Sequence, residues 1–166
     1  MVLATHAIVG ATVASTFTTN PVYAFLVAFV SHFLLDSIPH WDYQLLSLKR
    51  DEEKNLNHDM VLGKKFLVDL VRIGFDALIG VAISVLLFVY ILKLSTLNVI
   101  LASVVGAILP DPLQFVYWKT RSKVLLPLQK FHKWIHGRTL TIDTSVGILL
   151  QVAIILIFLS ISLLIR

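Results

Sequence analysis

Histidine and aspartate residues recur in this sequence at spacings that suit metal binding. His32 and Asp36 are four residues apart, as are His132 and His136, and a helix places residues four apart on one face. The second pair has the spacing with which one helix offers two imidazole ligands. The chain has no cysteine, and ligand sets of histidine and aspartate are typical of catalytic zinc or of similar metals such as manganese and iron. The chemistry these residues indicate is metal-assisted hydrolysis, in which water becomes a nucleophile near neutral pH.

Other ionisable residues extend this candidate set. Asp111 stands between two prolines, and Asp69 and Asp76 are seven residues apart with Arg72 between them on the same helical side. We expect Asp76 or Asp42 to act as general base or to orient a ligating histidine. We also expect three basic residues to bind phosphate, namely Arg72, Lys133 and Arg138. The predicted metal ligands are His6, His32, Asp36, Asp69, Asp111, His132 and His136.

Each of these residues also has an ordinary structural interpretation. Asp111 could cap a helix, and Arg72 could neutralise either Asp69 or Asp76 without any functional role. His132 and His136 could lie on the polar face of an interfacial amphipathic helix. The convergence of several such residues at one level supports a site more strongly than any single residue does.

The composition places the chain in a lipid bilayer. Of its 166 residues, 57% are hydrophobic and 14% are charged, and the mean hydropathy is +0.86. Ordinary soluble domains have roughly 45–50% apolar and about 25% charged residues. The sequence has no P-loop, dinucleotide-binding fingerprint or G-x-S-x-G motif. We expect no nucleic acid partner, because topology and anionic lipids explain the basic loops.

Five apolar segments are candidates to cross the membrane, because about 20 apolar residues span the hydrocarbon core. A turn in which Asn20 can cap a helix and Pro21 can begin it separates the first two. Pro110-Asp111-Pro112 interrupts an apolar stretch that continues to Trp118. We therefore predict an all-α integral membrane protein of one domain, residues 1–166, with about five transmembrane helices plus an interfacial helix. The predicted spans are residues 2–17, 22–38, 65–92, 97–109 and 146–165.

The basic residues predict the orientation of these spans. Two polar connections, at about residues 41–64 and 119–141 together with the adjacent Lys65, contain 11 Lys and Arg, whereas the opposite side has two, Lys93 and Arg166. The positive-inside rule then places the N-terminus and both connections in the cytoplasm. We expect a multi-pass protein of the plasma (inner) membrane whose candidate site faces the cytoplasm. Charged groups within a membrane mark functional sites by default.

Short motifs resemble a known family. Thr5-His6 with Gly10, the segment 31–42, Leu109-Pro110-Asp111, and the pair His132 and His136 are similar, in this order, to motifs of the YdjM-like predicted membrane-bound metal-dependent hydrolases. The resemblance implies a multi-span membrane protein related to zinc-dependent phospholipase C-like enzymes. After Asp111 this chain has Pro-Leu-Gln, where the family has a second Asp and a His. The residues available to supply the missing ligands are His32, Asp36, His40 and Asp42.

The predicted function is that of a membrane-embedded metal-dependent hydrolase, with zinc as the expected ion, acting on a phosphate ester of a lipid at the cytoplasmic leaflet. The alternative is a non-enzymatic membrane protein whose His/Asp cluster binds metal or lipid, or holds helices together. Polar groups at only one membrane face and the lack of a repeat count against a transporter. Small residues such as Gly74, Ala77 and Gly80 would allow close helix packing, either within one chain or between the chains of a homo-oligomer.

Overall fold

The computed structural model describes residues 1–51, 56, 58–137 and 139–165. They form an almost entirely helical protein, and the sequence prediction of an all-α fold is confirmed. In chain order the elements are α1 (Leu3–Phe17), α2 (Pro21–Asp36), β1 (Leu48–Lys49), β2 (Asp59–Met60), α3 (Lys64–Val85), the π-helix η1 (Leu86–Ile91), α4 (Leu97–Ile108), α5 (Pro110–Thr120), α6 (Leu126–Ile135) and α7 (Thr144–Leu164).

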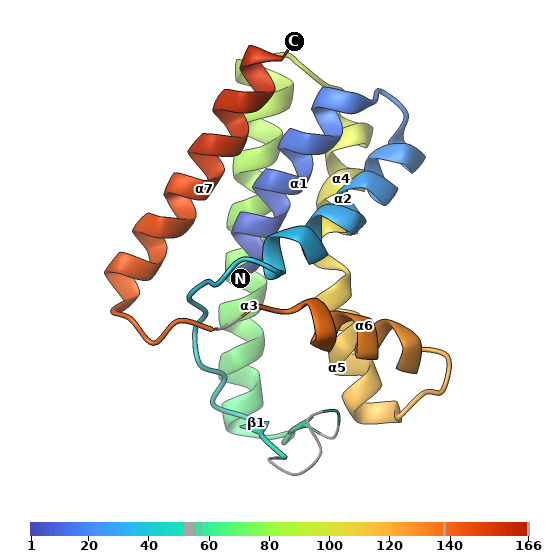
Figure 1. The fold of residues 1–166 in the computed structure, drawn as a ribbon, viewed down its shortest axis with the longest axis vertical. Helices are drawn as coiled ribbons and strands as arrows, with labels where there is room; N and C mark the ends of the chain where they lie inside the picture. Colours follow the sequence, from blue (N-terminus) through green and yellow to red (C-terminus); the bar gives the residue numbers. More distant parts are fainter. Residues whose placement is uncertain (52–55, 57, 138, 166) are drawn as a thin grey trace.

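Helix α1 lies at the centre of the bundle. It packs against α2, α3, α4 and α7, which stand around it in Figure 1. Eleven of its fifteen residues are buried, and most of these are small or β-branched. One hydrophobic cluster joins Ala7 and Ala11 of α1 to Phe88, Ile100 and Val104. Small residues let the surrounding helices approach the α1 backbone closely, so that α1 has almost no surface left for solvent or lipid.

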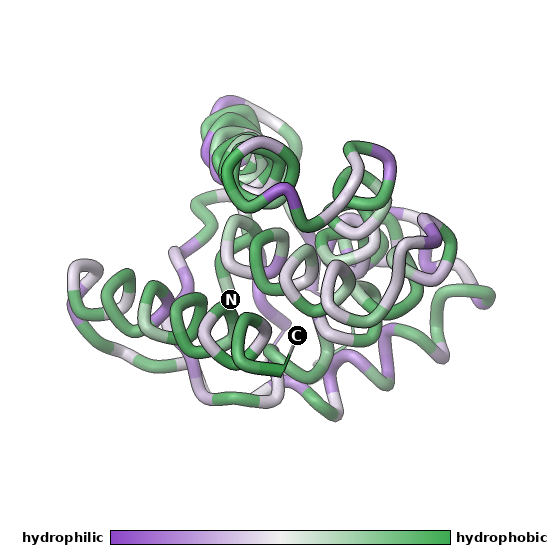
Figure 2. Tube along the Cα trace, turned by 90° about the horizontal axis from the view of Figure 1, so that it is seen from above, coloured by the Kyte–Doolittle hydropathy of each residue, from purple (hydrophilic) through white to green (hydrophobic). Residues whose placement is uncertain are grey.

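The outer helices show the opposite pattern. In α7 the buried residues are Gly147, Gln151 and Ser162, while large side chains such as Leu149 are exposed. Figure 2, seen from above, shows hydrophobic residues along much of each helix. Exposed apolar surface of this extent marks a protein that faces lipid or a partner.

Among the described residues, two helices are long and apolar enough to cross a membrane, namely Lys64–Ile91, formed by α3 and η1, and Thr144–Leu164. Helices α4 and α5 together form a third candidate, which bends by 42° at Pro110. The prediction of five spans is therefore corrected to two or three. Helices α1 and α2 have 15 and 16 residues, or about 22–24 Å at 1.5 Å per residue. That length is shorter than the roughly 30 Å of a hydrocarbon core.

Two local details position the remaining elements. The side chain of Asn20 accepts hydrogen bonds from the amides of Val22 and Tyr23, and Pro21 begins α2, so the predicted cap is confirmed. Helices α2 and α4 pass so closely that a Cβ atom at Gly106 would collide with the backbone carbonyl of Phe25. Helix α6, which lies between α5 and α7 in the chain, is the helix that we expected to be interfacial.

The sequence analysis did not predict the short antiparallel hairpin between α2 and α3. Its strands pair Leu48 with Met60 and Lys49 with Asp59. Met60 packs with Tyr117 and Trp118 of α5 in a small apolar cluster. Strand β1 lies at the lower end of the molecule in Figure 1, beside the lower end of α3.

Candidate metal centre

Four metal-ligand side chains from three helices meet beside the C-terminal end of α2. His32 and Asp36 come from α2, Asp111 from the first turn of α5, and His132 from α6. One ligand atom from each lies within 4.8 Å of the other three. This first group thus contains four of the seven predicted ligands. His32, Asp36 and His132 are almost completely buried, and Asp111 is partly exposed.

The local sequence explains how each side chain reaches this point. The four-residue spacing puts His32 and Asp36 on the same face of the last turn of α2. The bend at Pro110 begins α5, so that Asp111 enters its first turn. Asp111 does not cap this helix, because the capping position falls on Leu109 without a side-chain hydrogen bond. The cap interpretation of Asp111 is therefore wrong, and its carboxylate instead lies 3.6 Å from His32 Nε2.

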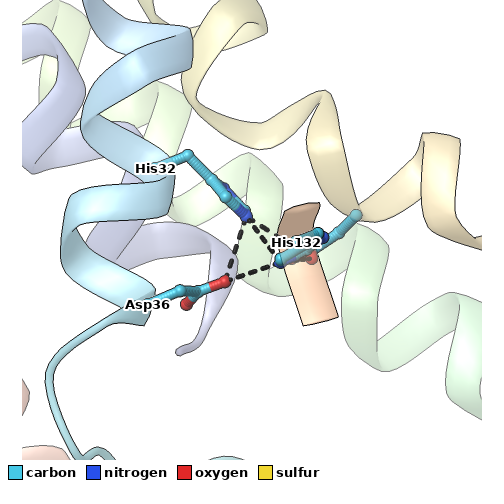
Figure 3. Close-up of side chains that lie close together, drawn as sticks. His32, Asp36 and His132 are labelled. Carbon is cyan, nitrogen blue, oxygen red and sulfur yellow. Dashed lines mark hydrogen bonds and ion pairs between the residues drawn. The ribbon is translucent and has the colours of Figure 1, made fainter. Parts of the chain in front are cut away.

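The side chains of His32 and His132 converge on one oxygen of Asp36 (Figure 3). Asp36 Oδ2 lies 2.9 Å from His132 Nε2 and 3.2 Å from His32 Nε2. The two Nε2 atoms are 3.4 Å apart, and Asp111 Oδ1 lies 4.0 Å from His132 Nε2. Two nitrogens and two carboxylates that face a common point form a mixed His/Asp ligand set.

The tautomer of His32 follows from its other ring nitrogen. Nδ1 lies 2.7 Å from the carbonyl oxygen of Ala107, and a carbonyl can only accept, so Nδ1 carries a proton and donates. In a neutral His32 ring, Nε2 then presents a lone pair to the carboxylate of Asp36. That contact is favourable only when a cation, either a proton or a metal ion, lies between the two groups. A ligating histidine whose other nitrogen donates to a carbonyl is the usual arrangement at metal sites.

A second group lies on the other side of Asp36. Ligand atoms of Asp36, His40 and His136 also lie within 4.8 Å of one another. The segment after α6 runs parallel to the end of α2, since the amide of Gly137 donates to the carbonyl of Asp36 and the amide of Leu140 donates to that of His40. A Cβ at Gly137 would lie 2.7 Å from the carbonyl oxygen of Ser37. Glycine therefore permits the close approach that places His136 beside His40.

His6 of α1 joins the same cluster. Its ring is completely buried and stacks on that of His32 with centroids 4.0 Å apart. Its Nε2 lies 3.1 Å from Asp36 Oδ1. Neither ring nitrogen of His6 has a hydrogen-bond partner among the described residues. The amino group of Met1 lies at this point too, 3.2 Å from Asp36 Oδ1 and 2.6 Å from His40 Nε2.

Two ionisable residues beyond the end of α2, His40 and Asp42, have shifted pKa values. Burial, reinforced by the positive charge of the Met1 amino group, lowers the pKa of His40 to about 4. This shift keeps the ring neutral, which is the form that binds metals. Loss of hydration raises the pKa of the Asp42 carboxyl above its ordinary value. Asp42 Oδ1 accepts a hydrogen bond from the amide of Tyr43, and Oδ2 lies 3.6 Å from the Met1 nitrogen.

Asp69 and Asp76 lie outside both metal-ligand groups that the described residues form. Asp69 accepts hydrogen bonds from the amides of Leu46 and Ser47, at 3.0 and 2.8 Å, and from the Ser47 hydroxyl at 2.6 Å. Asp76 accepts from the amides of Leu3 and Ala4, in the first turn of α1. The structure therefore shows Asp69 anchoring the loop before β1 and Asp76 capping α1.

Of the three predicted phosphate-binding residues, the structure describes two, and both are exposed. Arg72 is exposed on α3, and Lys133 is exposed on α6 next to His132. Arg138 lies outside the described residues. The sequence analysis missed the carbonyl of Ala107 and the glycine at position 137 as parts of the cluster. Both act through the backbone, so that their residue types give no signal of the role.

Comparison with known proteins adds no assignment, because no protein-family model, curated protein or solved structure matches the chain.

Proposed function

We propose that this protein binds a divalent metal ion at His32, Asp36, Asp111 and His132. The observation that carries the proposal is the meeting of these four ligand atoms, within 4.8 Å of one another, from three helices. Zinc suits two imidazoles and two carboxylates, as do manganese and iron. Two carboxylates also balance the charge of a divalent ion, which lowers the cost of burying it.

The lone pairs of the cluster support an ion over hydrogen bonds alone. His32 Nε2 and His132 Nε2 both face Asp36 Oδ2 and lie 3.4 Å from each other. In neutral rings, His132 can donate its Nε2 proton to Asp36, but His32 cannot because its proton is on Nδ1. Only an added positive charge satisfies every atom. A protonated His32 would form a structural clasp, and a metal ion would form a reactive site.

We further propose that the site hydrolyses a phosphate ester of a lipid at the cytoplasmic leaflet, as the YdjM-like resemblance implies. A bound divalent metal supplies a water-derived nucleophile near neutral pH and polarises a phosphoryl oxygen. The partial exposure of Asp111 leaves a side from which a substrate can approach. Asp42, partly exposed beyond His40, is the candidate to accept the proton released from water. Lys133, exposed on α6 and adjacent in sequence to His132, is the candidate to bind the phosphate.

The test is elemental analysis of detergent-purified protein, after loading with zinc, manganese or iron and removal of free metal. A His32→Ala/His132→Ala variant is expected to lose the bound ion. A His58→Ala variant is the matched control, because His58 lies in the hairpin loop and belongs to neither group. Bound metal in wild type then justifies assays with phospholipid and polyprenyl-phosphate substrates.

Two results would count against this function. Wild-type protein that binds no metal would leave the cluster as a proton-linked clasp between α2, α5 and α6. Metal binding without hydrolysis of any lipid phosphate ester would retain the metal site and reject the enzyme. An Asp42→Asn variant separates the roles, because it is expected to keep the metal and to lose most of the hydrolytic rate.

A further inference from the structure

The carboxylate of Asp36 has ligand-type groups on both of its oxygens. Oδ2 faces His32 and His132 at 3.2 and 2.9 Å. Oδ1 faces His6 at 3.1 Å and His40 at 3.8 Å. A carboxylate that presents each oxygen to a separate set of imidazoles has the arrangement of a bridging ligand. The surroundings of Oδ1 therefore need an explanation beyond the first metal site.

The histidines near Oδ1 carry their protons in the same way as His32. His40 Nδ1 donates to the carbonyl of Ile38 at 2.7 Å, and His136 Nδ1 donates to the carbonyl of Gly137 at 2.8 Å. In the neutral rings Nε2 is therefore unprotonated in both, and the two ring centroids are 5.0 Å apart. Three histidines thus share a backbone-fixed tautomer, which is the pattern of metal-ligating imidazoles.

His6 gives an independent indication of a missing partner. It is a completely buried polar side chain, and both of its nitrogens lack a hydrogen bond among the described residues. An unsatisfied buried polar group costs about 1–3 kcal/mol, so such a group calls for a specific reason. Its Nε2 is the ring atom that lies 3.1 Å from Asp36 Oδ1.

We infer that Asp36 bridges two metal ions. The second ion is held by Asp36 Oδ1, His40 and His136, and His6 completes its ligand set. This inference rests on the proposed function, because the first ion is the one described above. A pair of metal ions that share a carboxylate is the machinery with which many enzymes stabilise both the attacking and the leaving oxygen of a phosphoryl displacement. The second ion therefore favours phosphate esters, rather than amides or glycosides, as the substrate class.

One group competes with the second ion. The amino group of Met1 lies 2.6 Å from His40 Nε2 and 3.2 Å from Asp36 Oδ1.

Metal titration of the full chain in detergent micelles tests the inference, with Mn²⁺ as the probe and electron paramagnetic resonance as the readout. Wild type and the His58→Ala control are expected to bind two equivalents, with a spin-coupled signal in the doubly loaded form. His40→Ala/His136→Ala is expected to bind one equivalent with the signal of an isolated ion. A milder His136→Gln variant, with helicity checked by circular dichroism, guards against loss of folding.

The outcomes distinguish the two proposals. One equivalent in wild type, lost in His32→Ala/His132→Ala but unchanged in His40→Ala/His136→Ala, would overturn the second ion and leave the first site intact. Two equivalents without spin coupling would contradict the bridging role of Asp36. Two coupled ions without lipid hydrolysis would uphold the metal pair and reject the proposed enzyme. No bound metal in wild type would reject both.

Discussion

Two buried aspartates of this protein, Asp36 and Asp69, look alike in the sequence and differ in the structure. Asp36 is the last residue of α2, and Asp69 lies near the beginning of α3. Both side chains are almost completely buried. Asp36 is surrounded by imidazoles, with His132 Nε2 at 2.9 Å and His32 Nε2 at 3.2 Å. Asp69 is surrounded by the amides of residues 46 and 47 and one hydroxyl.

The donors decide what each carboxylate can do. Backbone amides carry their protons permanently, so they satisfy Asp69 fully and leave no place for an ion. Imidazoles can exchange a proton for a metal, so the surroundings of Asp36 remain open to a cation. A buried carboxylate therefore indicates a functional site only when its partners are themselves able to ligate or titrate. The following predictions test this contrast.

Replacing Asp36 gives the largest expected effect. Asp36→Ala removes the oxygen nearest to both histidines of the first site, and it is expected to lower metal affinity by more than the roughly 10–100-fold typical of outer-shell changes. Asp69→Ala is expected to retain the wild-type metal content. Chelator competition combined with elemental analysis measures both variants. Equal metal content in the two variants would remove the distinction between these carboxylates.

Asp69 is expected to contribute to stability instead. Asp69→Ala leaves two amides and one hydroxyl without their acceptor, and the cost is on the order of 3 kcal/mol when buried donors lose their partner. Denaturant titration in detergent micelles, followed by circular dichroism, measures the change in the free energy of unfolding. Asp143→Ala is the control, because Asp143 is exposed and makes no capping hydrogen bond. A cost no greater than that of the control would contradict the anchoring role.

The sequence predicted the helices well because their signals are local. The cap at Asn20, the break at Pro110 and the long apolar run of α7 each lie within a few residues of the boundary that they determine. The number of spans was wrong because the enclosure of α1 depends on four other helices. An apolar helix buried by protein and one that faces lipid have similar compositions.

The candidate site was predictable in part for the same reason. The four-residue spacings fixed which side chains share a helical face, and they placed His32, Asp36 and His132 in the set that the structure brings together. The partners of Asp69 and Asp76 could not be predicted, because they are mainly backbone amides, which every residue except proline carries. The position of His136 depends on a tertiary pairing of Gly137 with the end of α2.

Asp76 provides an intermediate case between the two aspartates. Its Oδ2 accepts hydrogen bonds from the amides of Leu3 and Ala4, at 2.6 and 3.4 Å, and it thereby caps α1 from a neighbouring helix. Asp76→Ala is expected to cost about 0.5–2 kcal/mol, the usual range for loss of a helix cap, with metal content unchanged. Hydrogen exchange locates the effect, since amide protection at Leu3 and Ala4 is expected to fall first. Loss of metal without faster exchange would instead place Asp76 in the site.

The smallest change in the free energy of unfolding is expected at an ordinary surface ion pair, whose aspartate is neither buried nor close to the metal-ligand groups. Lys119 Nζ lies 2.7 Å from Asp59 Oδ1, and both side chains are partly exposed. The hydrogen bond from Lys119 lowers the pKa of Asp59 below its ordinary 3.8. The pair therefore stabilises the fold above about pH 4 and loses this contribution as the pH falls through the lowered pKa. Solvent screening limits the contribution to a few tenths of a kcal/mol.

Lys119→Met is expected to cost that amount at pH 7, and almost nothing at pH 2 or in 1 M salt. A cost that is independent of both pH and salt would show that Lys119 acts through packing rather than through its charge.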